Sequence, residues 1–284
     1  MQTPAFFTLL STIVFSAFTT SVDAEVPYIR MYKPMNGVYM VKINNAADYI
    51  IEPVVADSLM SAKNVFEADG KIKILVNAGF FDPINEKTIS YVVKNKEVVL
   101  NPTENENLMN NEELKPHIDK ILNRAEFRVL KCDGKKTFDI AYHNDKVSES
   151  CELLHSIQAG PMLDERMDLE KEYFVVKNGD MVLRDSISAT KKVARTAIGL
   201  KSNDVYLFVV TDKNPMTIEE LAALMKKKKM TKAMAFDGGS STSFENGAIS
   251  VTSVGDGMGR DVKSFFAVRE LEVDNKPTND KMFR

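Results

Sequence analysis

Short runs in which apolar and polar positions alternate recur along the chain, separated by turn residues. Alternation of this kind predicts β-strands, because successive side chains of a strand point to opposite faces. Two dipeptides between paired runs, Asp133-Gly134 and Asn178-Gly179, predict tight β-hairpins, since glycine accepts the positive φ that such turns need. Strands or hairpins are predicted at residues 37–44, 49–56, 71–77, 89–100, 126–143, 172–183, 193–200, 204–212, 233–236 and 264–270.

One long stretch has helical periodicity instead. Thr217 is followed three residues later by Glu220, which is a capping box, and apolar positions then recur at helical spacing over 217–229. The polar, acidic stretch at 101–121 predicts an exposed insertion with a short helix. Because hairpins outnumber helices, the pattern predicts an α+β fold: a single domain with a mixed, largely antiparallel sheet and few helices packed against it.

The first 24 residues differ from the rest of the chain. An apolar stretch from Ala5 to Phe18 is followed by Val22 and Ala24, where a signal peptidase requires small residues, so residues 1–24 are predicted to be a signal peptide. An uncleaved anchor is the alternative, because no Lys or Arg precedes the apolar stretch. No later run has the roughly 20 apolar residues of a membrane span. We therefore expect an extracytoplasmic or secreted domain over 25–273, with a polar tail at 274–284.

Composition and charge narrow the class of protein further. With 284 residues, 44% of them apolar and 27% charged, the chain can bury one large core. The formal net charge of −3 and the absence of a basic stripe disfavour a nucleic-acid partner. The one basic run, Lys226–Lys229, falls in the last turn of the predicted helix, where cations complement the helix dipole. Two cysteines, Cys132 and Cys151, can pair in an exported chain, and the sequence leaves this open.

Polar or small residues stand at the strand ends in four segments: 77–82, 158–161, 195–199 and 237–242. Each of them alone is compatible with a simple turn. The last segment is the most informative, because Gly238 and Gly239 allow a ligand close to the backbone, whose N–H groups can bind an anion. Asp237, at the end of an apolar run, is expected to have a raised pKa suited to acid–base chemistry, or else to cap the turn amides. The segment is neither a Walker loop nor a nucleophile elbow.

Taken in order, these motifs resemble the phosphodiester glycosidase family over residues 70–270. The resemblance lies in NAGFFD (77–82), QAGPML (158–163), RTAIGL (195–200), the strand end Thr211-Asp212, TIEELAALM (217–225), AFDGGSSTSF (235–244) and GRDVKSFFAV (259–268). Family sequences commonly have Asn-Gly-Gly-Phe-Phe and Asp-Gly-Gly-Gly-Ser-Ser. Here Ala78 replaces a glycine of the first motif, and the second motif is one glycine short.

The resemblance implies an exported glycosidase that cleaves a sugar from the phosphate of a phosphodiester and acts on a phosphosugar or a phosphate-containing glycan. No cofactor and no metal ligand are assigned. Asp237 is the first candidate and Asp212 the second for the carboxylate that faces a positively charged sugar. Guanidinium groups match phosphate oxygens, which makes Arg195 and Arg260 candidates for the leaving phosphate. The other predicted substrate-binding residues are Asn77, Gln158, Thr196, Gly238, Gly239, Ser240 and Ser241, and Phe80 or Phe81 is expected to stack on a sugar.

Two alternatives remain open on the sequence. The shortened glycine run is compatible with a non-catalytic envelope module that binds glycans. Ser240 or Ser241 would instead serve as the nucleophile of a serine-dependent phosphoesterase. Metal dependence is also open, because Asp82, Asp212 and Asp237 could gather around a hard cation.

Overall fold

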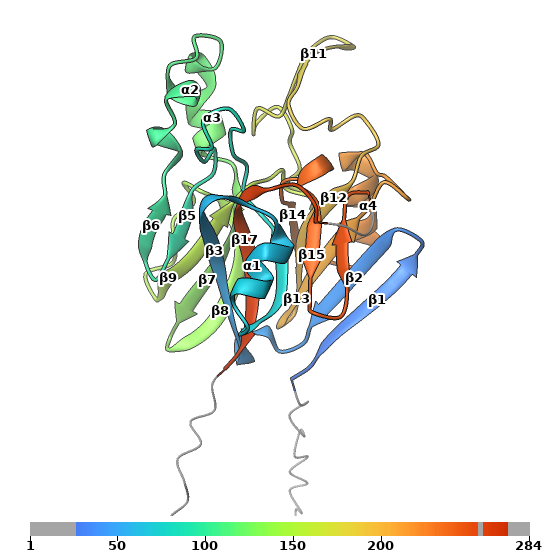
Figure 1. Cartoon of the computed structure of the whole chain (residues 1–284). Helices are drawn as coiled ribbons and strands as arrows, with labels where there is room; N and C mark the ends of the chain where they lie inside the picture. The colour runs from blue at the N-terminus through green and yellow to red at the C-terminus, as the bar shows by residue number, and fades with distance from the viewer. Residues whose placement is uncertain (1–26, 255–257, 272–284) are drawn as a thin grey trace, which may run out of the picture.

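The computed structural model describes residues 27–254 and 258–271, drawn in colour in Figure 1. The predicted signal peptide at 1–24 and the polar tail at 274–284 lie outside these residues. Strands dominate the described part, and all pairings between its strands are antiparallel, so the predicted α+β class is confirmed. Within residues 27–254 and 258–271, no helix has the length and apolar content needed to span a membrane.

Three five-stranded sheets and one separate hairpin make up the fold. The first sheet has the order β1 (Ile29–Met35), β2 (Val38–Ile43), β13 (Asp204–Val210), β12 (Arg195–Lys201) and β14 (Lys232–Ala235). The second has the order β16 (Ser250–Thr252), β15 (Ser243–Glu245), β4 (Ile72–Asn77), β17 (Val262–Glu270) and β3 (Tyr49–Met60). The third has the order β6 (Glu97–Leu100), β5 (Val92–Lys94), β9 (Cys151–Gln158), β7 (Ala125–Cys132) and β8 (Lys135–Tyr142). The hairpin consists of β10 (Val175–Asn178) and β11 (Met181–Asp185).

Helices are few and short. The α-helices are α1 (Ala62–Ala68), α2 (Glu106–Met109), α3 (Ile118–Leu122) and α4 (Ile218–Lys227). Single 3₁₀ turns are η1 (Ala46–Asp48), η2 (Pro102–Glu104), η3 (Lys115–His117) and η4 (Gly239–Ser241). The predicted capping box is present: Thr217 accepts a hydrogen bond from the Glu220 amide, and the Glu220 side chain accepts one from the Thr217 amide. The predicted insertion at 101–121 contains α2 and the start of α3 (Figure 1).

The core lies between the sheets, and strand alternation divides it. Along β13, Leu207 and Val209 face a central cluster shared by all three sheets, whereas Phe208 and Val210 face the helix α4 on the outer side. The second sheet is covered on its outer face in the same way, where α1 places Val65 in a cluster with residues of β3, β4 and β17. The central strands are therefore buried on both faces, and their sequences are almost continuously apolar.

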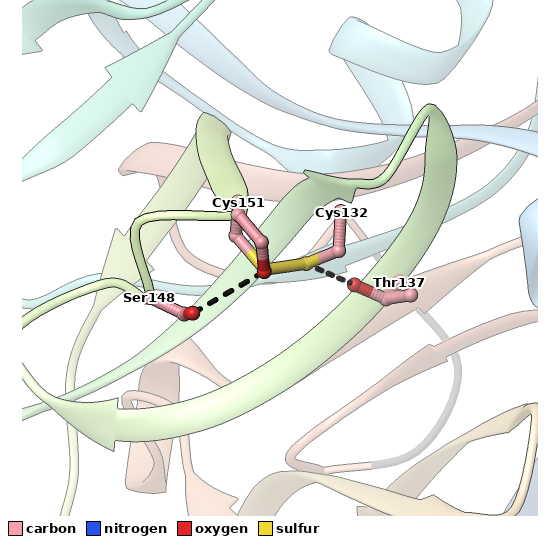
Figure 2. The surroundings of a disulfide bond; sticks show 5 residues. Cys132, Thr137, Ser148 and Cys151 are labelled. Carbon is pink, nitrogen blue, oxygen red and sulfur yellow. Dashed lines mark hydrogen bonds between the residues drawn. A yellow bond between two sulfur atoms is a disulfide. The ribbon is translucent and has the colours of Figure 1, made fainter.

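The structure pairs the two cysteines in a disulfide (Figure 2). Cys132 ends β7 and Cys151 begins β9, and the two residues are directly opposite each other in the antiparallel ladder. Thr137 of β8 lies beside the bond, with its hydroxyl 3.3 Å from the Cys132 sulfur. The two cysteines are 19 residues apart in the sequence, and β8 lies between them. The disulfide therefore closes a loop that contains β8.

Replacing both cysteines, Cys132→Ser with Cys151→Ser, is expected to lower the free energy of unfolding by about 3 kcal/mol, because the crosslink restricts the unfolded chain. Urea unfolding of the two proteins measures the difference. In the presence of reductant, the free energy of unfolding of the wild-type protein should fall to that of the double variant. Equal midpoints for the oxidised wild type and the double variant would show that the crosslink contributes nothing.

Candidate active site

The four segments with polar strand ends meet at one edge of the first and second sheets. Main-chain hydrogen bonds join them: the Asp237 amide donates to Ala78 O at 2.8 Å, Phe236 to Thr196 O at 2.9 Å, and Gly160 to Ala235 O at 3.0 Å. One detail of the sequence prediction is wrong, because Arg195 and Thr196 begin β12 rather than end a strand. They still reach the same edge, since the start of an antiparallel strand lies beside the end of its neighbour.

A cavity of about 540 Å³ opens at this edge. One wall comes from the insertion that carries α2, and another from the chain that follows β11, and Figure 1 shows both projecting from the same end of the molecule. Asp237 is the one carboxylate among the described residues that line the cavity. Four arginines line it as well: Arg124, Arg184, Arg195 and Arg260. The described cavity wall thus combines four guanidinium groups with a single carboxylate.

Asp237 is half-buried and is held by its own turn. Its Oδ1 accepts the Gly238 amide at 2.9 Å, and the Ser241 hydroxyl also bonds to its side chain. Burial raises the pKa of Asp237 to about 6, although these hydrogen bonds and the charge of Arg260 oppose the shift. The carboxylate is therefore mainly ionised at neutral pH, yet it can exchange a proton near that pH.

Asn77 and Thr196 are fully buried and hold the main chain of the acid. Asn77 Nδ2 donates to the carbonyl oxygen of Asp237 at 2.6 Å. Its Oδ1 accepts the Thr196 hydroxyl at 2.7 Å and the Ser243 amide at 3.0 Å. These polar groups are occupied within the protein, so in this structure the two side chains position Asp237 and do not line the cavity.

Gln158 is also fully buried and is absent from the cavity lining. Its Oε1 accepts the Tyr91 amide at 3.2 Å, and its Nε2 donates to the carbonyl oxygens of Leu122 at 2.7 Å and Arg124 at 3.4 Å. Gln158 therefore fixes the main chain that carries Arg124 into the cavity.

The glycine turn lies against the start of β12. A Cβ on Gly238 would come within 3.0 Å of the Ala194 carbonyl oxygen, and Gly239 has a φ of +58°. The Gly239 amide donates to that same carbonyl at 2.8 Å, so it is already paired within the protein. The exposed side of the turn presents Ser240, whose hydroxyl accepts a hydrogen bond from Arg260 Nη1 at 3.1 Å. Arg260 extends over the Phe81 ring, 5.2 Å from its centroid.

Arg195 lies next to the glycine turn and is 3% exposed. Its guanidinium donates to four main-chain carbonyls: Met216 at 2.9 Å, Ile187 at 2.9 Å, Ser188 at 2.6 Å and Lys191 at 3.0 Å. Burial lowers the pKa of Arg195 to about 10, which leaves it charged at neutral pH. Arg195 therefore ties the loop after β11 to the cavity and adds a positive charge there.

Asp212 does not line the cavity. It is exposed, and its Oδ1 accepts the Ala194 amide at 3.2 Å, beside the start of β12. Asp82 bonds to the Ile84 amide and to the Asn107 side chain. In the described part of the chain, no group of three or more His, Cys, Asp or Glu residues could hold a metal ion, so these aspartates do not gather around a cation there.

Sequence reasoning missed Arg124 and Arg184. Arg124 is 6% exposed and lies just before β7, with its guanidinium carbon 3.9 Å from the Phe174 ring centroid. Arg184 is near the end of β11, and its guanidinium lies over the Tyr173 ring. Both lie outside the four motifs, and no local pattern distinguishes them from surface arginines. Only the folded arrangement brings them to the cavity.

With this geometry in place, comparison with known proteins gives the family. A model of the phosphodiester glycosidase family matches residues 70–269, and the chain belongs to that family. The comparison with curated proteins finds no match. Membership supports a hydrolase of this kind, as the sequence motifs suggest.

Solved structures share the fold at low sequence identity. A hypothetical protein from Synechocystis superposes with a TM-score of 0.59 at 14% identity, covering 86% of this chain and 62% of that one. This chain therefore spans less than two thirds of that protein. The catalytic domain of zebrafish N-acetylglucosamine-1-phosphodiester alpha-N-acetylglucosaminidase superposes with a TM-score of 0.56 at 14% identity, covering 87% of this chain and 83% of that one.

Proposed function

We propose that this chain hydrolyses the glycosidic bond of a sugar-1-phosphodiester and releases a free sugar and a phosphomonoester. The observation that carries the proposal is the cavity itself, where four guanidinium groups accompany a single carboxylate. A phosphodiester is an anion, and guanidinium groups bind its oxygens through charge-assisted hydrogen bonds. The family match and the zebrafish glycosidase, which is named for such a substrate, support the same reaction.

The chemistry follows from the groups next to Asp237. The bond between the anomeric carbon and the phosphate oxygen breaks, and the phosphate keeps the electron pair. We assign the departing oxyanion to Arg260 and Ser240, which are hydrogen-bonded to each other at the glycine turn. Such a leaving group needs little protonation, so the main demand is to stabilise the positive charge that develops on the sugar. Ionised Asp237 meets that demand, either by attacking the anomeric carbon or by taking a proton from the water that does so.

The aromatic residues add a surface for the sugar. Phe80 and Phe81 both line the cavity. Phe81 is 7% exposed and packs in the cluster beneath the second sheet, whereas Phe80 is only partly buried. Phe80 is therefore the ring that we assign to a sugar face.

A direct test is to incubate the protein with the methyl phosphodiester of N-acetylglucosamine 1-phosphate and follow the products by proton and phosphorus NMR. We expect free sugar and methyl phosphate. Water labelled with heavy oxygen should place the label in the sugar. Absence of turnover, with glycan binding retained, would favour the alternative of an envelope glycan-binding module.

A serine-dependent phosphoesterase is the second candidate, because the Ser241 hydroxyl is hydrogen-bonded to the Asp237 carboxylate. No histidine is among the described residues of the cavity wall, so the usual base of a serine nucleophile is missing from it. The same labelling experiment separates the two reactions, since cleavage of a P–O bond would place heavy oxygen in the phosphate.

We further propose that the protein works outside the cytoplasm, on a phosphosugar or phosphate-containing glycan of the cell envelope. The disulfide between Cys132 and Cys151 supports this, because such bonds persist in oxidising compartments. Cell fractionation combined with thiol alkylation tests it. Protein found in the cytoplasm with both thiols reactive would contradict the proposal.

The pH dependence of kcat/KM should show an acidic limb, with half of the plateau value reached near the pKa of Asp237, which burial raises to about 6. The reaction requires the ionised form, so activity rises with pH, and kcat/KM reports the pKa of the free enzyme. A phosphodiester has no proton that titrates in this range. A profile that instead falls through this pH would assign Asp237 as the proton donor.

A further inference from the structure

Arg124 and Arg184 also line the cavity, but the reaction above assigns the departing phosphate to Arg260 and Ser240 rather than to this pair. They lie on neighbouring aromatic rings: the Arg124 guanidinium carbon is 3.9 Å from the centroid of Phe174, and that of Arg184 is 5.1 Å from the centroid of Tyr173. Burial lowers the pKa of Arg124 to about 9, and the positive charge of Arg184 adds to this shift while Glu172 opposes it. Two guanidinium groups in the cavity wall are thus held on the rings of consecutive residues.

The donors of this pair are incompletely used. Arg124 gives Nε to the Glu172 carbonyl at 3.0 Å and Nη2 to the Tyr173 carbonyl at 3.5 Å. Arg184 Nε is buried and has no hydrogen-bond partner among the described residues. A buried donor left without a partner is costly. In the described part of the chain, the arginines that form ion pairs are Arg128, Arg166 and Arg269. Arg124 and Arg184 are not among them.

Glu172 is an internal carboxylate whose charge acts on Arg124, but its oxygens accept main-chain amides rather than a guanidinium. Glu172 is fully buried, and its two carboxylate oxygens accept the amides of Ala125 and Met162, each at 2.9 Å. Burial raises the pKa of Glu172 to about 7, so the group is only partly ionised at neutral pH. Asp185, next to Arg184 in the sequence, caps the amides of Ala189 and Thr190 instead.

We propose that Arg124 and Arg184 form a second anion subsite of the cavity, and that the substrate carries a second anionic group, a phosphate or a carboxylate, in addition to its phosphodiester. The inference rests on the proposed function for the identity of the first anion, which Arg260 and Ser240 bind beside Asp237. The second group supplies the ion-pair partner that neither guanidinium has among the described residues. The substrate class is therefore a sugar-1-phosphodiester with an acidic sugar or with a further phosphate beyond the first.

Calorimetric titration of the Asp237→Asn protein tests the subsite without turnover. Three probes differ in charge: the methyl phosphodiester of N-acetylglucosamine 1-phosphate has one anionic group, UDP-N-acetylglucosamine has a second phosphate, and the methyl phosphodiester of glucuronic acid 1-phosphate has a sugar carboxylate. At least one two-charge probe should bind about tenfold more tightly than the one-charge probe, which is the effect of one good charge-assisted contact. Which of them does so shows the side of the phosphodiester on which the second anion lies.

Adding Arg184→Gln should abolish that preference, and Arg184→Lys should keep part of it, because lysine retains the charge but not the planar fork. Lys177→Gln is the matched control, since it removes an exposed cation from the same hairpin outside the cavity, and it should leave the preference unchanged. Two results would overturn the subsite: no preference for either two-charge probe, or a preference that survives Arg184→Gln. If Arg184→Gln loses the preference but the wild-type protein hydrolyses none of the probes, the subsite is supported and the proposed reaction is refuted.

Discussion

Replacement of Asp237 by asparagine is expected to lower kcat by about a thousandfold, in the range typical for loss of a positioned acid–base or nucleophilic group. The amide has nearly the same shape and retains an oxygen that can accept the Gly238 amide, which lies 2.9 Å from Oδ1 in the wild type. What is lost is the negative charge that faces the sugar. Steady-state rates of sugar release measure the effect, and substrate affinity should change far less than kcat.

Stability of the same variant separates a chemical role from misfolding. Because burial raises the pKa of Asp237 to about 6, the folded state binds a proton more tightly than the unfolded state does, and wild-type stability falls as pH rises from about 4 to 6. Asparagine does not ionise, so the variant does not lose this stability as the pH rises. The variant should therefore be more stable than wild type by about 1–3 kcal/mol near pH 8, with the difference vanishing near pH 4.

Asp212→Asn is the control for this experiment. Asp212 is exposed and lies outside the cavity, with its carboxylate on the Ala194 amide. We expect it to reduce turnover by less than about tenfold, through a small shift at the start of β12. If Asp212→Asn abolishes turnover and Asp237→Asn does not, the catalytic carboxylate is Asp212, the second candidate of the sequence analysis.

Local signals account for the parts of the fold that the sequence predicts. The capping box of Thr217 and Glu220 fixes the start of α4, and the Asp133-Gly134 turn joins β7 to β8 with positive φ at both residues. The edge strand β1 and the helix α1 are not predicted. The sequence of β1 includes Pro34 and alternates poorly, and α1 is only seven residues long. β1 forms because it pairs with β2, and α1 forms because it packs against the second sheet, and no short window of sequence reveals either contact.

The sequence likewise predicts some residues of the candidate site and not others. Glycines and polar strand ends identify the segments that converge, since close main-chain approach there requires small residues. Asn77 and Thr196 have side chains suited to binding a sugar, but in the structure they bond to each other and to the Asp237 turn. Arg124 and Arg184 carry no signal in the sequence, because their place in the cavity depends on strands and loops far away in the chain. Residue type and spacing thus locate the site, but they do not distinguish the buried residues that position it from the residues that line the cavity.

Gly160→Ala is expected to have the largest effect on stability, lowering the free energy of unfolding by about 3–5 kcal/mol through two combined costs. Gly160 has a φ of +97°, a conformation that side chains disfavour. A Cβ there would overlap Glu172 Oε2 and lie 3.1 Å from the Phe174 ring. Glu172 cannot move away easily, because its carboxylate holds the amides of Ala125 and Met162. The Phe174 ring in turn supports Arg124, so strain at this position reaches the cavity wall.

Gly134→Ala provides the matched comparison in urea unfolding. Gly134 also has a positive φ, +80°, but nothing lies within 4 Å of the added Cβ. Only the conformational cost applies, so we expect a loss of about 1 kcal/mol. The excess loss in Gly160→Ala then measures the collision with Glu172, and it should shrink in Gly160→Ala combined with Glu172→Ala, because the two residues are in contact. If the two glycine variants lose the same free energy of unfolding, Glu172 and Phe174 move aside without measurable cost, and the cavity wall beneath Arg124 is not rigid.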